Sequence, residues 1–260
     1  MRIIVCIKQV PDSGEVRFDK ETHSMIREGL PSIINPFDEN AIEAALQLRE
    51  EHGGEVIVLS MGAPHAEEQL RQSIAMGADR AILLTDRRFA LADTLATAYS
   101  LSTAIKKIGD YDLLLFGKQA IDGDTAQVGP GVAEMLELPQ ITYVREIQVA
   151  DGKVTAERVL EDSYEIVEAQ LPALLTVVKE INEPRHASLR GVLKAKKAEV
   201  TIWKPEDIDA ELAKIGIEGS ACSVIETFTP EPRTGTEKLS GTSEEIAEVL
   251  FARLRQQNVL

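Results

Sequence analysis

The chain has 260 residues, 44% of them hydrophobic, and its 28 Lys and Arg against 43 Asp and Glu give a formal net charge of −15. A nucleic-acid-binding protein gains affinity from a basic surface, so this charge disfavours nucleic acid as a partner. The length and apolar content predict a globular protein with a sizeable core, and two cysteines are too few for a disulfide framework. No apolar run is long enough to insert into a membrane, so we expect a cytoplasmic protein.

The first half of the chain alternates between apolar runs and helical patterns. Strands are predicted at residues 3–8, 55–60, 80–85 and 112–117, and helices at 38–51, 65–76, 93–108 and about 125–136. Asp38 is placed to cap the first helix, and Gly77 to end the second. Strands that alternate with such helices indicate βαβ units, and right-handed crossovers then predict a doubly wound, mostly parallel, Rossmann-like α/β sheet.

The pattern changes after Pro139. An antiparallel hairpin is predicted from residues 141–150 and 153–160 around an Asp-Gly turn, with further strands at 164–169 and 173–178. Residues 179–197 are polar and predicted to be irregular, and a short helix is expected at 205–215. The last helix, 242–257, begins with the capping box Thr242-x-x-Glu245. We expect one α/β domain over residues 1–199 and a C-terminal arm over residues 200–260.

Ligands of parallel sheets lie beyond the carboxyl ends of the strands, which makes the loop after the fourth strand a candidate site. Gly123 and Gly129 in this loop allow close approach, Thr125 offers a hydroxyl, and a helix N-terminus follows, which suits a phosphate or diphosphate. The alternative is an Asp-Gly turn followed by a helix cap. The chain has no P-loop, no three-glycine dinucleotide motif and no nucleophile elbow.

Two other segments are weaker candidates for nucleotide contacts. Asp93 or Thr94 would cap the third helix, with Thr97 one turn on, and this segment alone is typical of a capped helix. Asp93 would repel a phosphate, so an anion would be held by the two threonines and backbone N–H groups. Asn35-Pro36-Phe37-Asp38 has the composition of a turn and a cap, and Asn35 could contact an adenine edge.

A basic segment interrupts the acidic chain. Between Arg185 and Lys204 there are six basic residues and one acidic residue, a local charge of +5. A solvated basic face is the ordinary explanation. The other is a surface that docks a partner protein, with Leu189 as an apolar anchor inside a polar rim.

Together these segments resemble the β subunit of electron transfer flavoprotein. The shared motifs, in the family's order, are V-C-I-K-Q-V-P, N-P-F-D, A-M-G-A-D-R, G-K-Q-A-I-D-G-D-T-A-Q-V-G-P and N-E-P-R-x-A-S-L-R-G-x-x-K-A-K-K. The resemblance implies a heterodimer with an α subunit that carries FAD, on which the C-terminal arm and its helix pack. It implies that the first domain binds an adenine nucleotide. It also implies a recognition loop for acyl-CoA dehydrogenases at 179–199, with Leu189 as the anchor and Arg185, Arg190 and Lys194 steering an acidic partner.

The implied nucleotide site combines the family's segments with the threonine-containing loop after the third strand. Its residues are Cys6, Asn35, Pro36, Phe37, Asp38, Met61, Arg87, Asp93, Thr94, Thr97, Ala120, Ile121, Asp122, Gly123, Asp124, Thr125, Ala126, Gln127, Val128 and Gly129. Thr94, Thr97 and Thr125 would hold a diphosphate, with Arg87 near the flavin or nucleotide anions. We expect no side chain to act as acid, base or nucleophile, because the flavin supplies the chemistry.

The resemblance covers two branches of the family. In the ordinary branch the β subunit holds structural AMP; in the electron-bifurcating branch it holds a second FAD that accepts hydride from NADH. Electrons then pass to ferredoxin or flavodoxin and, through the α-subunit FAD, to an acyl-CoA dehydrogenase. The segments D-R-R-F-A-L-A-D-T-L-A-T and D-G-D-T resemble the bifurcating branch, which we favour, although Leu91 stands where glycine is expected. A more distant alternative is a homodimeric, non-redox nucleotide-binding sensor.

Overall fold

A computed structural model describes residues 1–12, 17–18, 25–26, 31–226 and 237–260. It divides into two compact units, Met1–Ile225 and Glu226–Leu260. In the described ranges no helix is both long enough and apolar enough to cross a membrane.

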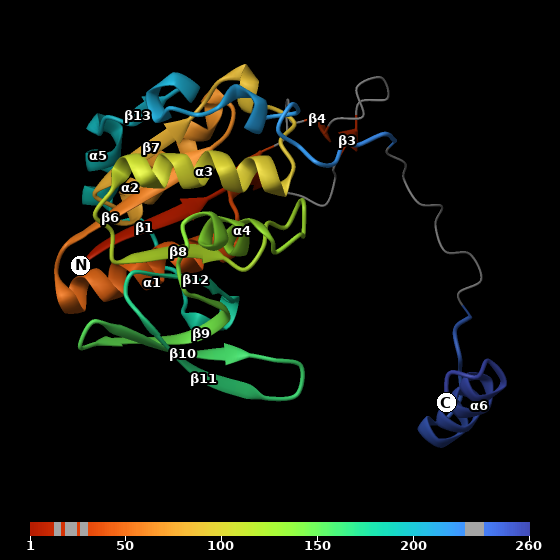
Figure 1. Cartoon of the computed structure of the whole chain (residues 1–260). Coiled ribbons are helices and arrows are strands. Elements are labelled where there is room, and N and C mark those ends of the chain that lie inside the picture. The colour runs from red at the N-terminus through yellow and green to blue at the C-terminus, as the bar shows by residue number, and fades with distance from the viewer. Residues whose placement is uncertain (13–16, 19–24, 27–30, 227–236) are drawn as a thin grey trace. The chain divides into compact units, whose positions relative to one another are not determined.

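A nine-stranded sheet forms the centre of the first unit (Figure 1). In spatial order its strands are β11 (Tyr164–Gln170), β10 (Lys153–Val159), β9 (Gln140–Ala150), β12 (Ala173–Val177), β8 (Leu113–Gly117), β1 (Arg2–Ile7), β6 (Glu55–Met61), β7 (Arg80–Leu84) and β13 (Thr201–Trp203). Neighbouring strands run parallel from β9 to β13, and β9, β10 and β11 form an antiparallel meander. The structure therefore confirms the mostly parallel sheet with a later hairpin.

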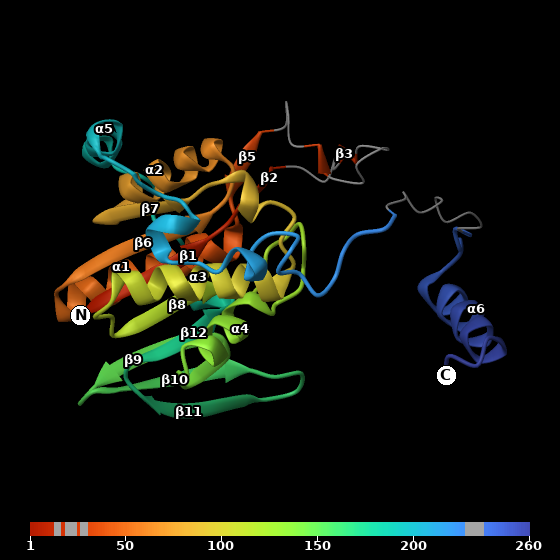
Figure 2. The same ribbon diagram turned by 45° about the horizontal axis from the view of Figure 1, so that its top comes forward.

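Helices cover both faces of the parallel part of the sheet (Figure 2). Helices α1 (Pro36–His52) and α2 (Glu67–Met76) pack on one face, and α3 (Thr94–Ile108) and α4 (Val128–Met135) on the other. Successive residues of β1 alternate between the two cores: Ile3 and Val5 join the first, Ile4 and Cys6 the second. A strand buried on both faces must be apolar throughout, which is why its continuous hydrophobic run predicted it correctly.

The chain order creates a switch point between β1 and β8. From β1 the chain winds outward through β6 to β7, then returns across the sheet to β8, on the other side of β1. Helices that follow these neighbouring strands leave toward opposite faces, so a space opens beyond their carboxyl ends. The loop that follows Gly117 begins at this point.

Short elements complete the first unit. They are β2 (Gln9–Pro11) paired with β5 (Ser32–Ile34), β3 (Arg17–Phe18) paired with β4 (Met25–Ile26), and the 3₁₀ turns η1 (Pro64–Ala66), η2 (Arg87–Phe89), η3 (Lys179–Ile181), η4 (Pro205–Ile208) and η5 (Leu212–Lys214). In the second unit, α6 (Ser243–Gln256) begins with the predicted capping box, in which Glu245 N–H donates to Thr242 Oγ1 at 3.3 Å.

Four local predictions need correction. Residues 189–197, predicted to be irregular, form the helix α5 (Leu189–Lys197), whose first turn is capped by the Ser188 hydroxyl. The helix predicted at 205–215 is instead the two 3₁₀ turns η4 and η5. Residues 201–203, expected in the arm, pair as β13 with β7. Helix α1 begins at Pro36 with Asn35 at the N-cap position, so Asp38 lies inside the first turn and does not cap it.

Candidate functional site

Asp38 links the carboxyl ends of β1 and β8. The carboxylate accepts the Lys8 backbone N–H at 2.7 Å and the Gly117 N–H at 3.1 Å. A Cβ added at Gly117 would lie 2.3 Å from Asp38 Oδ1, so only glycine fits there. Asp38 therefore holds the ends of β1 and β8 together at the switch point.

Burial governs the protonation of Asp38 and of its neighbour Cys6. Burial raises the pKa of Asp38 to about 7, although hydrogen bonds from Asn35, Lys8 and Gly117 favour the charged form. Burial, and next the Asp38 charge, raise the pKa of the Cys6 thiol well above its usual range. The Cys6 thiol is thus kept protonated at neutral pH and suits packing, not nucleophilic chemistry.

Asn35 fixes the start of the loop that follows β8. Its side chain is 1% exposed, donates to the Gln119 carbonyl at 2.9 Å and accepts from the Ile121 N–H at 3.1 Å. Because both amide atoms bind the loop, Asn35 sets its position directly. Contact between Asn35 and an adenine edge stays a prediction.

The acidic residues of this loop are paired within the chain. Lys8 Nζ lies 2.6 Å from Asp122 Oδ1, and the Asp122 side chain is only 4% exposed. The Gln119 side chain donates to Asp124, which has a left-handed φ of 53°. These contacts hold the loop while engaging two carboxylates that would otherwise repel an anion.

The glycines of the loop have different roles. A Cβ added at Gly123 would have Lys8 Nζ as its near neighbour, at 3.8 Å, so the loop is open to close approach there. A Cβ added at Gly129 would lie 2.8 Å from Thr176 Cγ2. Gly129 is therefore required for packing of α4 against β12, a role that the sequence pattern does not reveal.

A hydrogen bond brings the loops after β7 and β8 together. The side chains of Thr94, at the start of α3, and Gln127, just before α4, are joined at 3.0 Å. Thr97 is half-buried one turn along α3, and Thr125 is exposed. Helix α4 begins at Val128, so Thr125 lies three residues before it. The two threonine-containing segments thus meet at one edge of the sheet.

Asp93 caps α3, as predicted, but only one of its two carboxylate oxygens takes part in the cap. Oδ1 accepts the Ala96 N–H at 2.9 Å, and Oδ2 accepts the N–H groups of Ala221 and Cys222 at 2.7 and 3.0 Å. Burial alone would raise the pKa of Asp93, but these backbone donors outweigh it and lower the pKa. The carboxylate is therefore charged and directed toward donors of the chain itself.

The other predicted nucleotide contacts line the same edge. Arg87 is exposed at the start of η2, and Met61 is half-buried at the end of β6. Pro36 and Phe37 form the first turn of α1, with Lys179 Nζ 5.1 Å from the centre of the Phe37 ring. Ala120 and Ala126 are half-buried in the loop after β8, where Ile121 is exposed.

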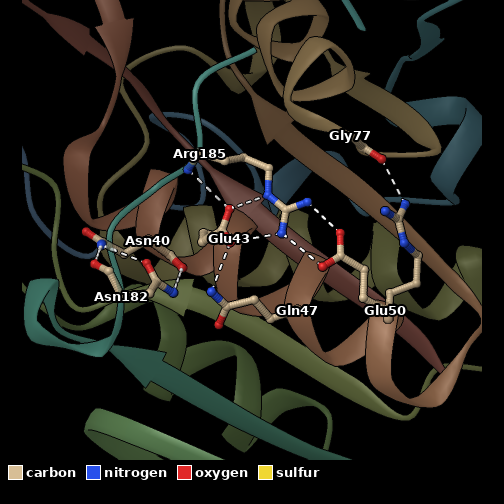
Figure 3. A network of polar contacts seen from close by, with 8 residues as sticks. Asn40, Glu43, Gln47, Glu50, Gly77, Asn182 and Arg185 are labelled. Atoms are coloured by element: carbon tan, nitrogen blue, oxygen red, sulfur yellow. Dashed lines mark hydrogen bonds and ion pairs between the residues drawn. The ribbon is translucent and has the colours of Figure 1, made fainter. Parts of the chain in front are cut away.

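The segment before α5 is anchored on α1 (Figure 3). Arg185 donates to the buried Glu43 at 2.7 and 3.0 Å and forms a second ion pair with Glu50. Beside it, the amide of Asn40 donates to Asn182 Oδ1 at 3.0 Å, and the Asn182 amide donates to the Asn40 carbonyl at 3.0 Å. Arg185 thus positions the segment, although the sequence suggested that it steers a partner.

Helix α5 presents apolar side chains to solvent. Leu189 is 80% exposed, and Val192 and Leu193, at helical spacing from it, are also exposed. Gly191 packs against α2, where a Cβ would lie 2.1 Å from the Ala75 carbonyl oxygen. Lys194 Nζ donates to the Ala78 carbonyl at 3.2 Å, whereas Arg190 is exposed.

Several residues that organise the site were not predicted. Lys8 and Gln119 lie within motifs shared with the family, but their hydrogen-bond partners depend on how the loop after β8 folds. Asn40 and Glu43 are polar residues buried in α1, and that helical pattern alone gave no sign of their partners 142 residues away. A polar residue at a core-facing helical position is the signal that could have identified them.

Comparisons with known proteins identify the family of the chain. A family model described as the electron transfer flavoprotein domain matches residues 22–208. The electron transfer flavoprotein subunit beta of Thermoanaerobacterium thermosaccharolyticum is 50% identical over 261 residues, with full coverage of both chains. Subunit CarD of the caffeyl-CoA reductase-Etf complex of Acetobacterium woodii is 49% identical, also with full coverage of both. Protein FixA of Azorhizobium caulinodans is 46% identical over 98% of this chain and 94% of its own.

The family model covers well over half of the chain, and the relatives align along nearly its whole length. The chain belongs to the electron transfer flavoprotein family, among its β subunits.

Proposed function

We propose that the chain is the β subunit of a cytoplasmic, electron-bifurcating electron transfer flavoprotein. It pairs with an α subunit that carries one FAD and itself holds a second FAD at the edge of the sheet beyond β1, β7 and β8. The FAD would supply the redox chemistry, with NADH as the donor of a hydride, that is, two electrons and a proton that would be released. One electron would go to ferredoxin or flavodoxin, and the other, through the α-subunit FAD, to an acyl-CoA dehydrogenase.

The contact between Thr94 and Gln127 is the observation that carries this proposal. It joins Thr94 of the D-T-x-A-T segment at 3.0 Å to Gln127, which follows the D-G-D-T motif in the loop after β8, and so brings the two segments side by side. A diphosphate is longer than a single phosphate, and two adjoining anion-binding segments suit it. Thr94, Thr97 and Thr125 would bind it, while Gly123 allows close approach of the backbone.

The charges of the site fit an anionic nucleotide. Asp93, Asp122 and Asp124 all lie at this edge, and each accepts a hydrogen bond or ion pair from within the chain. Their charge is thereby offset locally by backbone dipoles, an ammonium or an amide. The protein contributes binding and orientation, and the flavin supplies the redox chemistry.

Leu91 favours the second candidate, in which the site holds structural AMP. Its side chain is 68% exposed on the loop before α3, and it adds bulk where the bifurcating branch has glycine. Its φ of 59° is nevertheless the left-handed conformation that glycine adopts easily. The loop thus has at Leu91 a conformation that a glycine would also adopt, which is why we favour FAD.

The proposed partners contact separate regions. The α subunit is bound through the C-terminal arm, including α6, on which Val249, Leu250 and Phe251 are exposed. The dehydrogenase docks on α5 at Leu189, with Arg190 near it. Among the relatives, CarD is named as a subunit of a complex with caffeyl-CoA reductase, which fits a redox partner for this chain.

Purification of the chain together with its α subunit, followed by a count of flavin and AMP per heterodimer, tests the proposal. We expect two FAD and no AMP, with bleaching of the flavin absorbance by NADH under anaerobic conditions. One FAD with one AMP would contradict bifurcation and support the second candidate. A stable homodimer without flavin would contradict both.

A further inference from the structure

The loop that leads into α3 is covered by a segment from the end of the first unit. Gly216, with a φ of 53°, packs so closely on this loop that a Cβ would lie 2.0 Å from the Arg88 carbonyl oxygen. Ile215 and Phe89 are buried in the same apolar cluster, and Arg88 forms an ion pair with Glu206. Residues 205–222 therefore fix the path of residues 86–93.

Hydrogen bonds at Ser220 complete this contact. The Ser220 hydroxyl accepts the Asp93 N–H at 2.8 Å and donates to the Gly216 carbonyl at 2.7 Å. The next two residues, Ala221 and Cys222, donate their N–H groups to Asp93 Oδ2. Three successive residues thus bind the residue that caps α3.

These three residues lie where the domain ends. Residues 223–226 are exposed, and the first unit ends at Ile225. The hydrogen bonds to Asp93 therefore lie near the C-terminal end of the first unit. The chain that leaves the first unit is thus joined by hydrogen bonds to the N-terminus of α3.

We propose that Ser220, Ala221 and Cys222 form a latch that positions the N-terminus of α3 for the diphosphate of the β-bound nucleotide and couples nucleotide binding to the end of the first unit. Ser220 is then a positioning residue: it acts through Asp93 and Thr94, not on the nucleotide itself. This inference rests on the proposed function and adds a determinant of nucleotide affinity outside the two nucleotide loops.

The charge of Asp93 explains why the latch matters for an anion. With the latch closed, three backbone N–H groups share the charge of the carboxylate. When the latch opens, Oδ2 loses two donors, and a less compensated carboxylate opposes the incoming phosphate. Linkage is reciprocal, so a bound nucleotide must in turn hold the latch closed.

The test uses the αβ heterodimer from which the β-bound nucleotide has been removed, with FAD as the probe. Ser220→Ala removes the hydrogen bond from the Asp93 N–H together with the one to the Gly216 carbonyl, and we expect FAD to bind at least about five-fold more weakly in the β site. Ser220→Thr keeps the hydroxyl and should keep wild-type affinity. Ser223→Ala, the same change at an exposed position three residues on, is the matched control and should have no effect.

Hydrogen exchange at the Ala221 and Cys222 amides supplies the second measurement. FAD should slow exchange at both amides in the wild type and much less in Ser220→Ala. Equal FAD affinity in wild type and Ser220→Ala, or exchange that FAD leaves unchanged, would overturn the latch and leave the proposed function standing. A β site that takes no FAD would overturn the proposed function and this inference together.

Discussion

At the scale of single residues, Asp38 makes the stability of the chain depend on pH. Its pKa is about 7 in the folded state against an ordinary value of 3.8, because the carboxyl group is buried. Between about pH 4 and 7 the folded state therefore binds one more proton at this site than the unfolded state. The resulting stabilisation is complete below about pH 4 and is lost as the pH rises through 7.

We expect this group to lower the free energy of unfolding by up to about 1.4 kcal/mol for each unit of rising pH within that window. Urea denaturation of the wild type and of Asp38→Asn at pH 5, 6, 7 and 8 measures the effect. Other groups titrate alike in both proteins, so the difference between the two curves isolates Asp38. Parallel curves would show that the carboxyl group titrates at its ordinary pKa.

Lys8 controls the charge of the nucleotide loop. Its ammonium pairs with Asp122, whose side chain is nearly buried, so Lys8→Met would leave a carboxylate with little compensation. Because Lys8 is itself partly exposed, we expect a loss of about 1–3 kcal/mol in unfolding free energy, together with weaker nucleotide retention.

The double variant Lys8→Met, Asp122→Asn removes the uncompensated charge and should recover most of that stability. Lys153→Met is a matched control, because Lys153 pairs with Glu168 in an exposed ion pair on the hairpin. Such surface pairs contribute about 0–1 kcal/mol, so little change is expected. Thermal denaturation measures the stability of each variant, and an assay of bound nucleotide measures its retention. Equal losses of stability in Lys8→Met and Lys153→Met would show that the ion pair with Asp122 has no special role.

At the scale of elements, one side of α5 is anchored on α2 and the opposite side is exposed to solvent. Gly191 and Ala195 face α2, and Arg71 donates to the carbonyls of Ala195 and Ala198 at 2.8 and 2.9 Å. The opposite side exposes Leu189 and its apolar neighbours. A helix fixed on one side and apolar on the other is suited to dock a partner without rearranging.

Leu189→Ala should therefore lower the rate of electron transfer to the dehydrogenase about ten-fold or more, as removal of a buried interface anchor does. Reduction of the heterodimer by NADH should be unchanged, because α5 is not among the elements that form the proposed nucleotide site. Ile166→Ala, on the exposed strand β11, is the control for loss of a large apolar side chain at the surface. Equal loss of both activities in Leu189→Ala would place α5 outside the dehydrogenase interface.

The elements also show which features a sequence can predict. The strands β1, β6, β7 and β8 are continuous apolar runs, so periodicity was sufficient to find them. Helix α5 was missed because Gly191 and a series of lysines weaken its pattern, and its stability comes from packing on α2. The partners of Asn35 and Asp38 were missed because they lie 30 to 86 residues away along the chain, where local pattern carries no information.

At the scale of the whole molecule, the basic residues of one segment stand out from an otherwise acidic chain. The chain carries −15 overall, yet residues 185–204 carry +5. Two of these cations bind within the chain: Arg185 to Glu43 and Glu50, and Lys194 to the Ala78 carbonyl. Arg190, Lys196 and Lys197 are exposed around the apolar face of α5. The basic segment is thus partly internal anchor and partly exposed rim.

An exposed basic rim predicts that encounter with an acidic dehydrogenase depends on salt. Electron transfer at limiting concentrations should slow as ionic strength rises from about 0.02 to 0.2 M, because the screening length falls to below 10 Å. Lys196→Glu should reduce the rate several-fold at low salt and much less at high salt, whereas Lys106→Glu, the same change on the exposed side of α3, should not. Stopped-flow measurement of both variants provides the test. A rate that is independent of salt, or equal effects of the two substitutions, would show that docking relies on the apolar face of α5 alone and that the local reversal of charge serves only to anchor the segment.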